Sequence, residues 1–367
     1  MIPFVDLDIQ YKEIKSEIDD AIKECIADSN FIRGKAVSDF EMAFASYLGI
    51  KYCIGCGNGT DALEIILTAL NISTGDEVIV PALTWISTAE AVTNVGAEPV
   101  FVDIDPRTYT IDFTCIEQKV TNKTKAIIPV HLYGCPADMS ELVSLAKKYN
   151  LHLIEDCAQA HGAEYSGKKV GTFGIASAFS FFPSKNLGAF GDAGAIVTNN
   201  EDLSNLIRKI SNHGQLNEKH KHFMIGRNSR LDSIQAAILN VKLKHLDVWN
   251  DKRIKAADYY RLRLGTSGSF ILPAVEESKK HVYHLFVIKC KERNKLIKLL
   301  DEKKISWGIH YPNALPFIEP YFYKKHIPND FKASSSIINE ILSIPIYPEI
   351  TEEQLETICG QLNQYDQ

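Results

Sequence analysis

The chain has 367 residues, of which 45% are hydrophobic, and its formal net charge at pH 7 is −6. This length and composition are sufficient for two globular domains with sizeable cores. The acidic balance, without a basic patch, argues against the classes of protein that bind nucleic acid or anionic membranes.

The first residues, Met1 to Asp8, have neither the basic start nor the apolar run of a targeting signal, and no later run approaches about 18 apolar residues. We therefore expect a soluble, cytoplasmic protein with no membrane partner. Eight cysteines in a chain of this length suit a reducing compartment. Cys53 and Cys56 form a CxxC pair, which we interpret as part of a buried strand. The three histidines within residues 213–222 indicate a polar surface loop, so no metal site is predicted.

In the first two thirds of the chain, segments with a helical period of apolar residues alternate with short apolar strands. In chain order, the pattern predicts helices at 11–28 and 39–48, a strand at 52–54 that leads into a helix from 60, strands at 77–81, 99–103, 125–131, 151–156 and 194–198, helices at 87–95, 139–149 and 202–210, and a long helix that ends near 264. Such alternation is typical of βαβ units and predicts an α/β fold around a buried, mostly parallel sheet.

After Ser267 the character of the sequence changes. The pattern predicts a strand at 283–290, a helix at 292–303, an extended segment at 305–310 and a closing helix at 351–364. This is a smaller α+β unit with its own core. We therefore expect a large domain at 1–245 and a small C-terminal domain at 246–367, with the long helix as a bridging element.

The glycine-rich turn after the first strand is a candidate phosphate site. Gly55, Gly57 and Gly59 lead into a helix that begins near Thr60. Free backbone N–H groups and the positive end of the helix dipole converge at such a turn, and the Thr60 hydroxyl adds a donor. The turn is not a dinucleotide fingerprint, because Thr60 occupies its third glycine position, and it is not a P-loop. Taken alone, it is better explained as a capped helix without a ligand.

Ligands of parallel sheets bind beyond the carboxyl ends of the strands. By this rule, five segments should surround one crevice: 57–60, 84–85, His131, 156–161 and 180–185. Each segment on its own has an ordinary structural explanation. Their convergence at one edge of the sheet favours a binding site.

Lys185 lies within the segment Ser180 to Asp192, which combines small, aromatic and turn-forming residues after an apolar run. A lysine in a semi-buried turn at a strand end can lose its proton and act as a nucleophilic amine, although a solvated lysine is the alternative. With the Asp156 carboxylate, the Trp85 ring and the phosphate turn, Lys185 matches the needs of pyridoxal phosphate. Considered singly, Asp156 could be a helix cap and Trp85 a core residue.

The chain resembles the DegT/DnrJ/EryC1/StrS family of sugar-nucleotide aminotransferases in six segments: GNGTDAL, DIDPRTYTID, PVHLYG, EDCAQAHGA, SFFPSKNLGAFGDAGA and NSRLDSIQAA. The resemblance runs from Phe4 to Pro312. It implies the PLP-dependent transferase fold type I, similar to aspartate aminotransferase, with a large domain and a smaller C-terminal α+β domain. Ala193 stands where the family commonly has a glycine, and a methyl group is tolerated there if the backbone φ is negative.

The resemblance also implies roles around pyridoxal 5′-phosphate. Lys185 would form the Schiff base with the cofactor, and Asp156 would pair with the pyridine nitrogen. Gln159 would lie against the ring near its phenolic oxygen, and Trp85 would stack on the ring. The matching phosphate-binding positions are Gly59, Thr60 and Ser180. Some relatives carry histidine in place of the lysine and perform dehydration, and Lys185 argues against that branch.

Asn228 matches the asparagine that reaches the phosphate from the neighbouring subunit, which implies a homodimer with shared active sites. Arg230, His310 and Tyr311 match positions close to the sugar nucleotide in relatives. The implied activity is transfer of an amino group from an amino acid, usually L-glutamate, to a keto sugar nucleotide. The product would be an amino sugar for surface polysaccharide or another glycan.

The identity of the sugar is open. Residues 213–232 resemble the corresponding segment of members that aminate 3-keto sugar nucleotides, especially UDP-linked 3-keto hexuronic acids, whose carboxylate an arginine can pair. A 3-keto substrate, UDP- or dTDP-linked, is therefore favoured over a 4-keto substrate. A regulatory member without turnover and a lyase or dehydratase are further alternatives.

Overall fold

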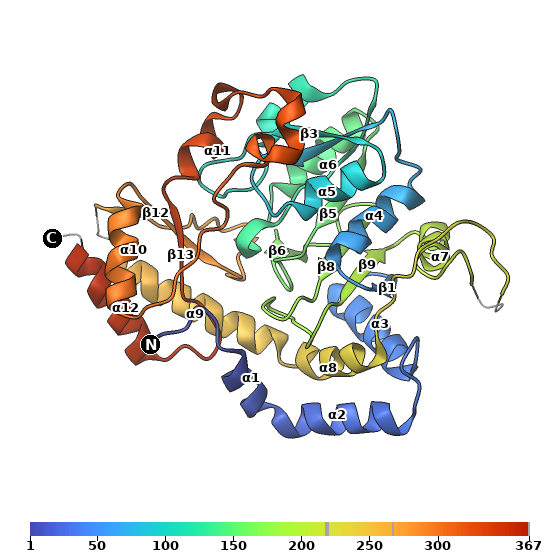
Figure 1. Cartoon of the computed structure of the whole chain (residues 1–367), viewed down its shortest axis with the longest axis horizontal. Helices are drawn as coiled ribbons and strands as arrows, with labels where there is room; N and C mark the ends of the chain where they lie inside the picture. Colours follow the sequence, from blue (N-terminus) through green and yellow to red (C-terminus); the bar gives the residue numbers. More distant parts are fainter. Residues whose placement is uncertain (217–219, 266–267, 366–367) are drawn as a thin grey trace.

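The computed structural model describes residues 1–216, 220–265 and 268–365, and its centre is a seven-stranded sheet (Figure 1). The strand order is β1-β9-β8-β5-β4-β2-β3. The strands are β1 (Tyr52–Cys56), β2 (Glu77–Pro81), β3 (Glu98–Val102), β4 (Thr124–Ile127), β5 (His152–Asp156), β8 (Ala176–Ser180) and β9 (Gly194–Thr198). β9 runs antiparallel to β1 and β8, and the other neighbours pair in parallel. The predicted α/β fold with a mostly parallel sheet is confirmed.

Helices cover both faces of the sheet, because its strands are hydrophobic on both sides. One face packs against α4 (Gly59–Ala69), α5 (Ser87–Asn94) and α7 (Glu201–Ile210). The other face packs against α3 (Lys35–Leu48), α6 (Met139–Lys148) and α8 (Ser233–Leu243). Within the described ranges, no helix is long and apolar enough to cross a membrane.

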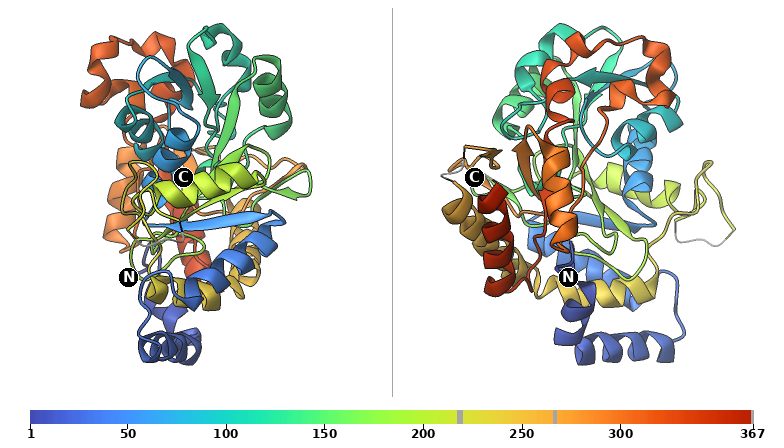
Figure 2. Two further views of the ribbon diagram at one scale, coloured as in Figure 1. Left: turned by 90° about the vertical axis from the view of Figure 1, so that its right-hand side faces the viewer. Right: turned by 60° about the vertical axis from the view of Figure 1, so that its left-hand side comes forward.

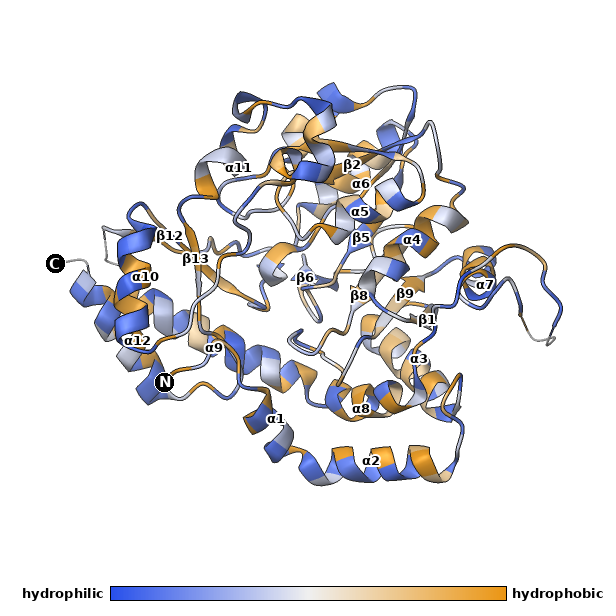
Figure 3. Cartoon of the chain, in the orientation of Figure 1, coloured by the Kyte–Doolittle hydropathy of each residue, from blue (hydrophilic) through white to orange (hydrophobic). Residues whose placement is uncertain are grey.

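Two helices that the sequence pattern predicts as continuous are interrupted, so the prediction was wrong at these points. The predicted helix 11–28 is α1 (Leu7–Glu13) and α2 (Lys15–Ala27), which separate at Ile14, where φ is −117°. The predicted helix that ends near 264 is α8 followed by α9 (Leu246–Leu264). At the second break the His245 amide donates to the Lys242 carbonyl, three residues back. α2 packs beside α8 at the edge of the molecule (Figure 2) and carries hydrophobic residues at intervals along its length (Figure 3).

The C-terminal part contains a three-stranded sheet of β10 (Phe270–Ile271), β12 (Phe286–Cys290) and β13 (Ile341–Ile344). Its core is shared with α9, α10 (Arg293–Glu302) and α12 (Glu352–Tyr365). The sequence pattern predicts β12, α10 and α12, but it does not predict β13. The unit has its own hydrophobic core, as expected for a small α+β domain.

The predicted boundary between residues 245 and 246 remains a proposal, because later segments return to the large sheet. Within 312–338, which includes α11 (Lys332–Ile337), three side chains belong to the core beside β3: Leu315, Tyr321 and Phe331. In addition, β11 (Lys279–Lys280) pairs with β6 (Glu164–Tyr165), which pairs with β7 (Lys168–Lys169). These contacts fix the small unit against the carboxyl-terminal edge of the large sheet, where the candidate site lies.

Candidate active site

A cavity of about 710 Å³ lies beyond the carboxyl ends of the strands. Of the residues to which the family resemblance assigns roles, all but two line it: Gly59, Thr60, Trp85, Asp156, Gln159, Ser180, Lys185, His310 and Tyr311 do, and Asn228 and Arg230 do not. The first seven come from the large domain, and the last two come from the segment after α10. The predicted convergence of strand-end residues on one crevice is therefore confirmed for most of the set.

The N-terminus of α4 opens into this cavity. The Asn58 side chain caps the helix by accepting from the Asp61 amide at 2.8 Å, while no described residue accepts from the amides of Gly59 and Thr60. A Cβ atom at Gly59 would lie 2.8 Å from Cβ of Ser180, so only glycine fits there. The helix is therefore capped, as expected for a turn without a ligand. It nevertheless has two free N–H groups that can bind an anion, as expected for a phosphate site.

Asp156 projects into the cavity from the end of β5. Its Oδ2 accepts from the Thr88 hydroxyl at 2.8 Å, and its Oδ1 accepts from the Ala158 amide at 3.1 Å. Burial raises the pKa of the Asp156 carboxyl, and these two bonds together with the Lys185 charge oppose that rise. The carboxylate is held in a fixed orientation, as a partner for a cationic ring nitrogen requires.

Lys185 lies in a tight turn, in which its amide donates to the Phe182 carbonyl at 2.8 Å. The next residue, Asn186, anchors the turn through its side chain, which donates to Oδ1 of Asn250 at 2.8 Å and to the Val282 carbonyl at 3.0 Å. Burial lowers the pKa of Lys185 to about 8, and the Asp156 carboxylate opposes this shift. At pH 7 about a tenth of the amine is therefore uncharged and nucleophilic, far more than for a lysine with its ordinary pKa.

Ala193, the residue that departs from the family pattern, is buried at the amino end of β9 and is not among the residues with positive φ. Its carbonyl accepts from the Phe181 amide at 2.8 Å. The added methyl group packs in the core formed with α3 and α8. The expectation that a negative φ accommodates alanine here is confirmed.

Gln159 links the cavity wall to Tyr311. Its Oε1 accepts from the Tyr133 amide at 2.7 Å, and its Nε2 donates to the Tyr311 hydroxyl at 2.9 Å. The Trp85 ring is tilted against Tyr311 with centroids 5.6 Å apart. Trp85 is 57% exposed, so it is not a core residue. Burial raises the pKa of Tyr311 to about 12, so its hydroxyl is protonated and available as a donor.

Two predicted histidines do not reach the cavity. His131 and His161 are both fully buried, so the expectation that they line the crevice was wrong. His161 packs against the rings of Phe179 and Phe181. Sequence reasoning placed every residue just past a strand at the crevice, but the side chains of a strand alternate between faces and half of them point away.

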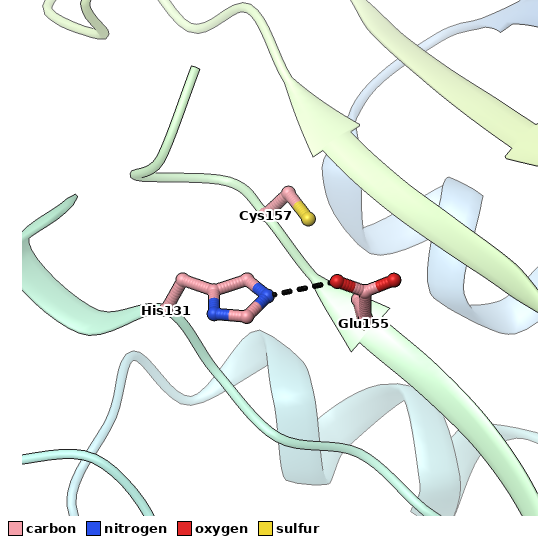
Figure 4. Close-up of side chains that lie close together, drawn as sticks. All are labelled: His131, Glu155 and Cys157. Atoms are coloured by element: carbon pink, nitrogen blue, oxygen red, sulfur yellow. Dashed lines mark hydrogen bonds and ion pairs between the residues drawn. The ribbon is translucent and has the colours of Figure 1, made fainter. Parts of the chain in front are cut away.

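His131, Glu155 and Cys157 form the cluster shown in Figure 4, and their polar atoms are close enough to suggest a metal site. His131 Nδ1 accepts from the Ala137 amide at 3.0 Å, so Nε2 carries the proton and donates to Glu155 at 3.1 Å. Glu155 also accepts from the amides of residues 171, 173 and 174 and from the hydroxyl of residue 177. His131 and Glu155 thus have their polar atoms engaged by hydrogen bonds within the protein, so the cluster is explained as a buried structural network.

The histidines of the 213–222 segment lie on the surface, as predicted. His213, His220 and His222 are all exposed, and His222 Nδ1 bonds to the His213 carbonyl at 2.7 Å. The part of this segment at 217–219 lies outside the described residues. Cys53 and Cys56 are buried in β1 and unpaired, which confirms the strand interpretation of the CxxC pair.

Asn228 and Arg230 lie apart from the cavity of their own chain. Asn228 is exposed and bridges to Asn212 through the backbone. Arg230 lines a separate small pocket and donates to Oδ1 of Asn212 at 3.1 Å. Neither residue lines the cavity of this chain.

Sequence reasoning missed Ser87, Thr88 and His284, which also line the cavity. Thr88 lies in the first turn of α5, where it bonds to Asp156, and Ser87 accepts from the Thr60 hydroxyl at 2.7 Å. Ser87 and Thr88 could have been predicted, because hydroxyl side chains in the first turn of a helix that follows a strand end lie near the ligand site of a parallel sheet. His284 comes from the small domain, and no local motif distinguishes it.

A model of the DegT/DnrJ/EryC1/StrS aminotransferase family matches residues 12–363. The chain is 46% identical over its whole length to the dTDP-3-amino-3,6-dideoxy-alpha-D-galactopyranose transaminase of Aneurinibacillus thermoaerophilus, of which it covers 99%. It is 44% identical, over 99% of this chain and 98% of the other, to the pleiotropic regulatory protein of Geobacillus stearothermophilus. The crystal structure of S. venezuelae DesV in complex with a ketimine intermediate superposes with a TM-score of 0.97, at 37% identity, and the match covers 100% of this chain and 98% of that one. The chain therefore belongs to the DegT/DnrJ/EryC1/StrS aminotransferase family.

Proposed function

We propose that this aminotransferase moves the amino group of L-glutamate to a 3-keto sugar nucleotide, linked to UDP or dTDP, for the synthesis of an amino sugar destined for polysaccharide or another glycan. One observation carries the catalytic part of the proposal. Lys185, with its lowered pKa, lines the same cavity as the fixed Asp156 carboxylate and the open N-terminus of α4.

The residues of the cavity fit pyridoxal 5′-phosphate, the cofactor of this family. The free amides of Gly59 and Thr60 and the Ser180 side chain would hold the phosphate. Asp156 would pair with the ring nitrogen, and Lys185 would hold the aldehyde carbon. When bound, the cofactor supplies an electron sink for the α-carbon of the amino donor.

Three groups of the chain have roles in the reaction with the amino donor. With its lowered pKa, Lys185 Nζ would accept the proton from the α-carbon of the amino donor and later give it up again. The lysine would act first as a general base and then as a general acid. Asp156 keeps its charge through the bonds from Thr88 and the Ala158 amide. The Tyr311 hydroxyl accepts a hydrogen bond from Gln159, which holds it in place, and it can donate its own proton to a ligand in the cavity.

A homodimer with shared active sites is part of the proposal. Asn228 is exposed and lies away from the cavity of its own chain, as a residue that serves a second copy would. Trp85 and Phe182 at the cavity, and Phe223 and Ile225 close to Asn228 in the chain, expose large apolar side chains that a second copy would cover. In such a dimer, Asn228 of each copy would complete the phosphate site of the other, and Arg230 would approach the sugar.

The substrate class rests on the comparisons and on Arg230. The transaminase from Aneurinibacillus is named for a 3-amino product, which supports a 3-keto substrate. Arg230 is not paired with a carboxylate in the described residues, so its guanidinium remains available for a sugar carboxylate or a phosphate. The eight unpaired cysteines support a cytoplasmic location.

A regulatory role is the second candidate, because one relative is named as a regulatory protein. A protein that only binds a ligand has no need of a reactive amine. Lys185 with a lowered pKa and the tethered Asp156 therefore favour turnover.

The decisive experiment is a panel of UDP- and dTDP-linked 3-keto and 4-keto sugars, each incubated with glutamate and the purified protein and followed by mass spectrometry. Amination replaces the keto oxygen by an amine, whereas dehydration removes the elements of water. We expect amination of a 3-keto sugar and none with Lys185→Ala. Amination of 4-keto sugars alone would overturn the substrate assignment, and a wild-type protein that binds no pyridoxal phosphate would overturn the activity.

A further inference from the structure

Lys242 in α8 is a buried lysine with no role in the site described so far. Its side chain is 2% exposed, and its Nζ donates to the Gly188 carbonyl at 2.7 Å, three residues after Lys185. Among the described residues, no carboxylate is close enough to form an ion pair with this amine. Burial lowers the pKa of Lys242 to about 8, and the more distant Glu349 carboxylate opposes this shift.

Two aromatic rings surround the Lys242 amine in place of a carboxylate. Its Nζ lies 5.0 Å from the ring centroid of Phe190 and 6.0 Å from that of Trp249. Such rings attract a cation, but less strongly than a buried carboxylate does. Removal of an ammonium from water without a counter-ion is costly, so an apolar side chain of the same length would pack here at a lower cost. The specific contact that the lysine adds is its bond to Gly188.

Gly188 lies directly against the turn that carries Lys185. A Cβ atom at Gly188 would overlap with the Pro183 carbonyl, so the two stretches of backbone are in close contact. The next amide, that of Ala189, donates to the Phe181 carbonyl at 2.8 Å. Lys185 lies between these contacting segments in the sequence. A displacement of Gly188 would therefore also displace the turn that carries the lysine.

Gln235 holds the same loop from the same helix. Its Oε1 accepts from the Phe190 amide at 2.8 Å. Gln235 and Lys242 are seven residues apart in α8, which places them on one face of the helix. With the bond from the Asn186 side chain to α9, three alternate residues after Lys185 are held by α8 and α9.

We propose that Lys242 and Gln235 are positioning residues that fix the direction of the Lys185 side chain by holding the loop that follows it. This inference rests on the proposed role of Lys185 as the lysine that holds the cofactor and moves the proton. A reacting group must be placed accurately, and an error of about 1 Å can cost about 100-fold in rate. The two side chains of α8 tie the loop to the rest of the large domain.

The first test measures amide hydrogen exchange of the purified full-length protein. Lys242→Met keeps the length of the side chain and removes the donor to Gly188. We expect the amides of residues 181–190 to exchange about tenfold faster than in the wild type, while the amides of β9 keep their rate. Unchanged exchange at 181–190, or equally faster exchange in β9, would overturn the proposal. This measurement requires neither a sugar nor an amino donor.

Gln235 offers a matched pair of variants for the same measurement. Gln235→Glu keeps an acceptor for the Phe190 amide, whereas Gln235→Met removes it at a similar length. Gln235 is only partly buried, so both variants should fold. We expect faster exchange at 181–190 in Gln235→Met and exchange close to the wild type in Gln235→Glu. Equal exchange in the two variants would overturn the role of Gln235.

The second test follows Lys185 itself. Pyridoxal phosphate is added back to cofactor-free protein, its bond to Lys185 is fixed with borohydride at timed intervals, and mass spectrometry quantifies the modified peptide. We expect attachment to be about tenfold slower in Lys242→Met. The half-reaction with glutamate should slow with little change in KM. Lys242→Arg, which keeps N–H donors, should recover part of both rates.

Wild-type rates in Lys242→Met would overturn this inference alone. A wild-type protein that attaches no pyridoxal phosphate to Lys185 would instead contradict the proposed function, and the exchange measurement would still decide whether α8 holds the loop. Arg293→Met in α10 is the control, because Arg293 also donates to a backbone carbonyl, that of Ile338 at 2.6 Å, but does not line the cavity. It should lower Tm without slowing attachment. Equal slowing in Arg293→Met and Lys242→Met would identify a general loss of stability as the cause and would overturn the proposal.

Discussion

Thr88 donates a hydrogen bond to Oδ2 of Asp156 at 2.8 Å and thereby ties the first turn of α5 to the carboxyl end of β5. Both residues are buried, and the Ala158 amide occupies the other carboxylate oxygen. Burial alone would favour the neutral acid. The threonine is therefore one of the groups that keep Asp156 ionised where a ring nitrogen would pair with it.

Thr88→Val should weaken cofactor binding, because it removes this donor without changing the shape of the side chain. The pKa of Asp156, already raised by burial, should rise further. A carboxylate with a raised pKa loses its charge at a higher pH, so the acidic limb of the kcat/KM profile should move to higher pH. We expect the Kd for pyridoxal phosphate to increase about tenfold, measured by absorbance titration. Thr88→Ser should retain most of the affinity, and an acidic limb that does not move in Thr88→Val would contradict this role.

The residues that local sequence could identify are those whose chemistry is visible without a partner. Asp156 was predicted because it lies at a strand end, and Lys185 was predicted because it lies in a turn just after a strand. Both features can be recognised within a short segment of sequence. Thr88 and His284 were missed, because their roles arise from contacts with residues 68 and 98 positions away. Only the folded sheet brings such pairs together.

The fold shows the same division between local and non-local information. The hydrophobic periods predict the alternation of strands and helices, but not the break between α8 and α9 at residues 244–245, where the sequence has no proline or glycine. β13 is likewise defined by its pairing with β12, 55 or so positions earlier in the chain, rather than by a distinctive composition.

Gly59→Ala should close the phosphate end of the cavity. The new methyl carbon would lie 2.8 Å from Cβ of Ser180, which is not the flexible end of a long side chain. We expect the affinity for pyridoxal phosphate to fall by about tenfold or more while the protein stays folded, measured by equilibrium dialysis and circular dichroism. Gly360→Ala in α12, where nothing lies within 4 Å of the added carbon, is the control and should bind the cofactor normally. Equal binding by both variants would argue against the cradle at Gly59.

Lys185→Met should stabilise the cofactor-free protein in a pH-dependent way. The pKa of Lys185 is lowered from 10.5 to about 8 in the folded state, so the folded state binds fewer protons than the unfolded state between these values. The destabilisation by the lysine is then fully present below about pH 8 and is relieved as the pH rises toward 10.5. We expect the substitution to raise Tm by about 1 to 3 °C at pH 7 and by less at pH 10. A gain in Tm that is the same at both pH values would show that burial of the charge is not the cause.

Glu155→Gln should destabilise the fold without affecting any metal. Burial favours a raised pKa, but His131 and the amides of Gly171 and Gly174 outweigh it and hold the pKa of Glu155 below its ordinary value of 4.5. A glutamine cannot accept all of these bonds, so the free energy of unfolding should fall by about 3 kcal/mol at pH 7. Because the lowered pKa stabilises the fold above about pH 4.5 and less as the pH falls, the difference from wild type should narrow in acid.

Two controls accompany Glu155→Gln. Glu164→Gln in β6 removes a partly exposed carboxylate whose ion pair with Lys280 is long, at 3.9 Å, and should change stability little. A chelator should leave the Tm of the wild type unchanged. A fall in Tm on chelation would identify the cluster of Figure 4 as a metal site after all.

Co-expression of Lys185→Ala with Asn228→Ala should restore activity that neither variant has alone. In the proposed dimer, each active site takes Lys185 from one copy and Asn228 from the other. A mixed dimer therefore has one site with both residues intact and one site that lacks both. With random pairing, half of the dimers are mixed and half of their sites are intact, so about a quarter of wild-type activity is expected. The measurement is the rate of glutamate-dependent amination by the co-purified mixture. Mixed dimers isolated through a different tag on each variant should show about half of wild-type activity, because one of their two sites is intact. If Asn228 served the cavity of its own chain, the intact lysine and the intact asparagine would never meet in one site, and the mixture would be as inactive as its components.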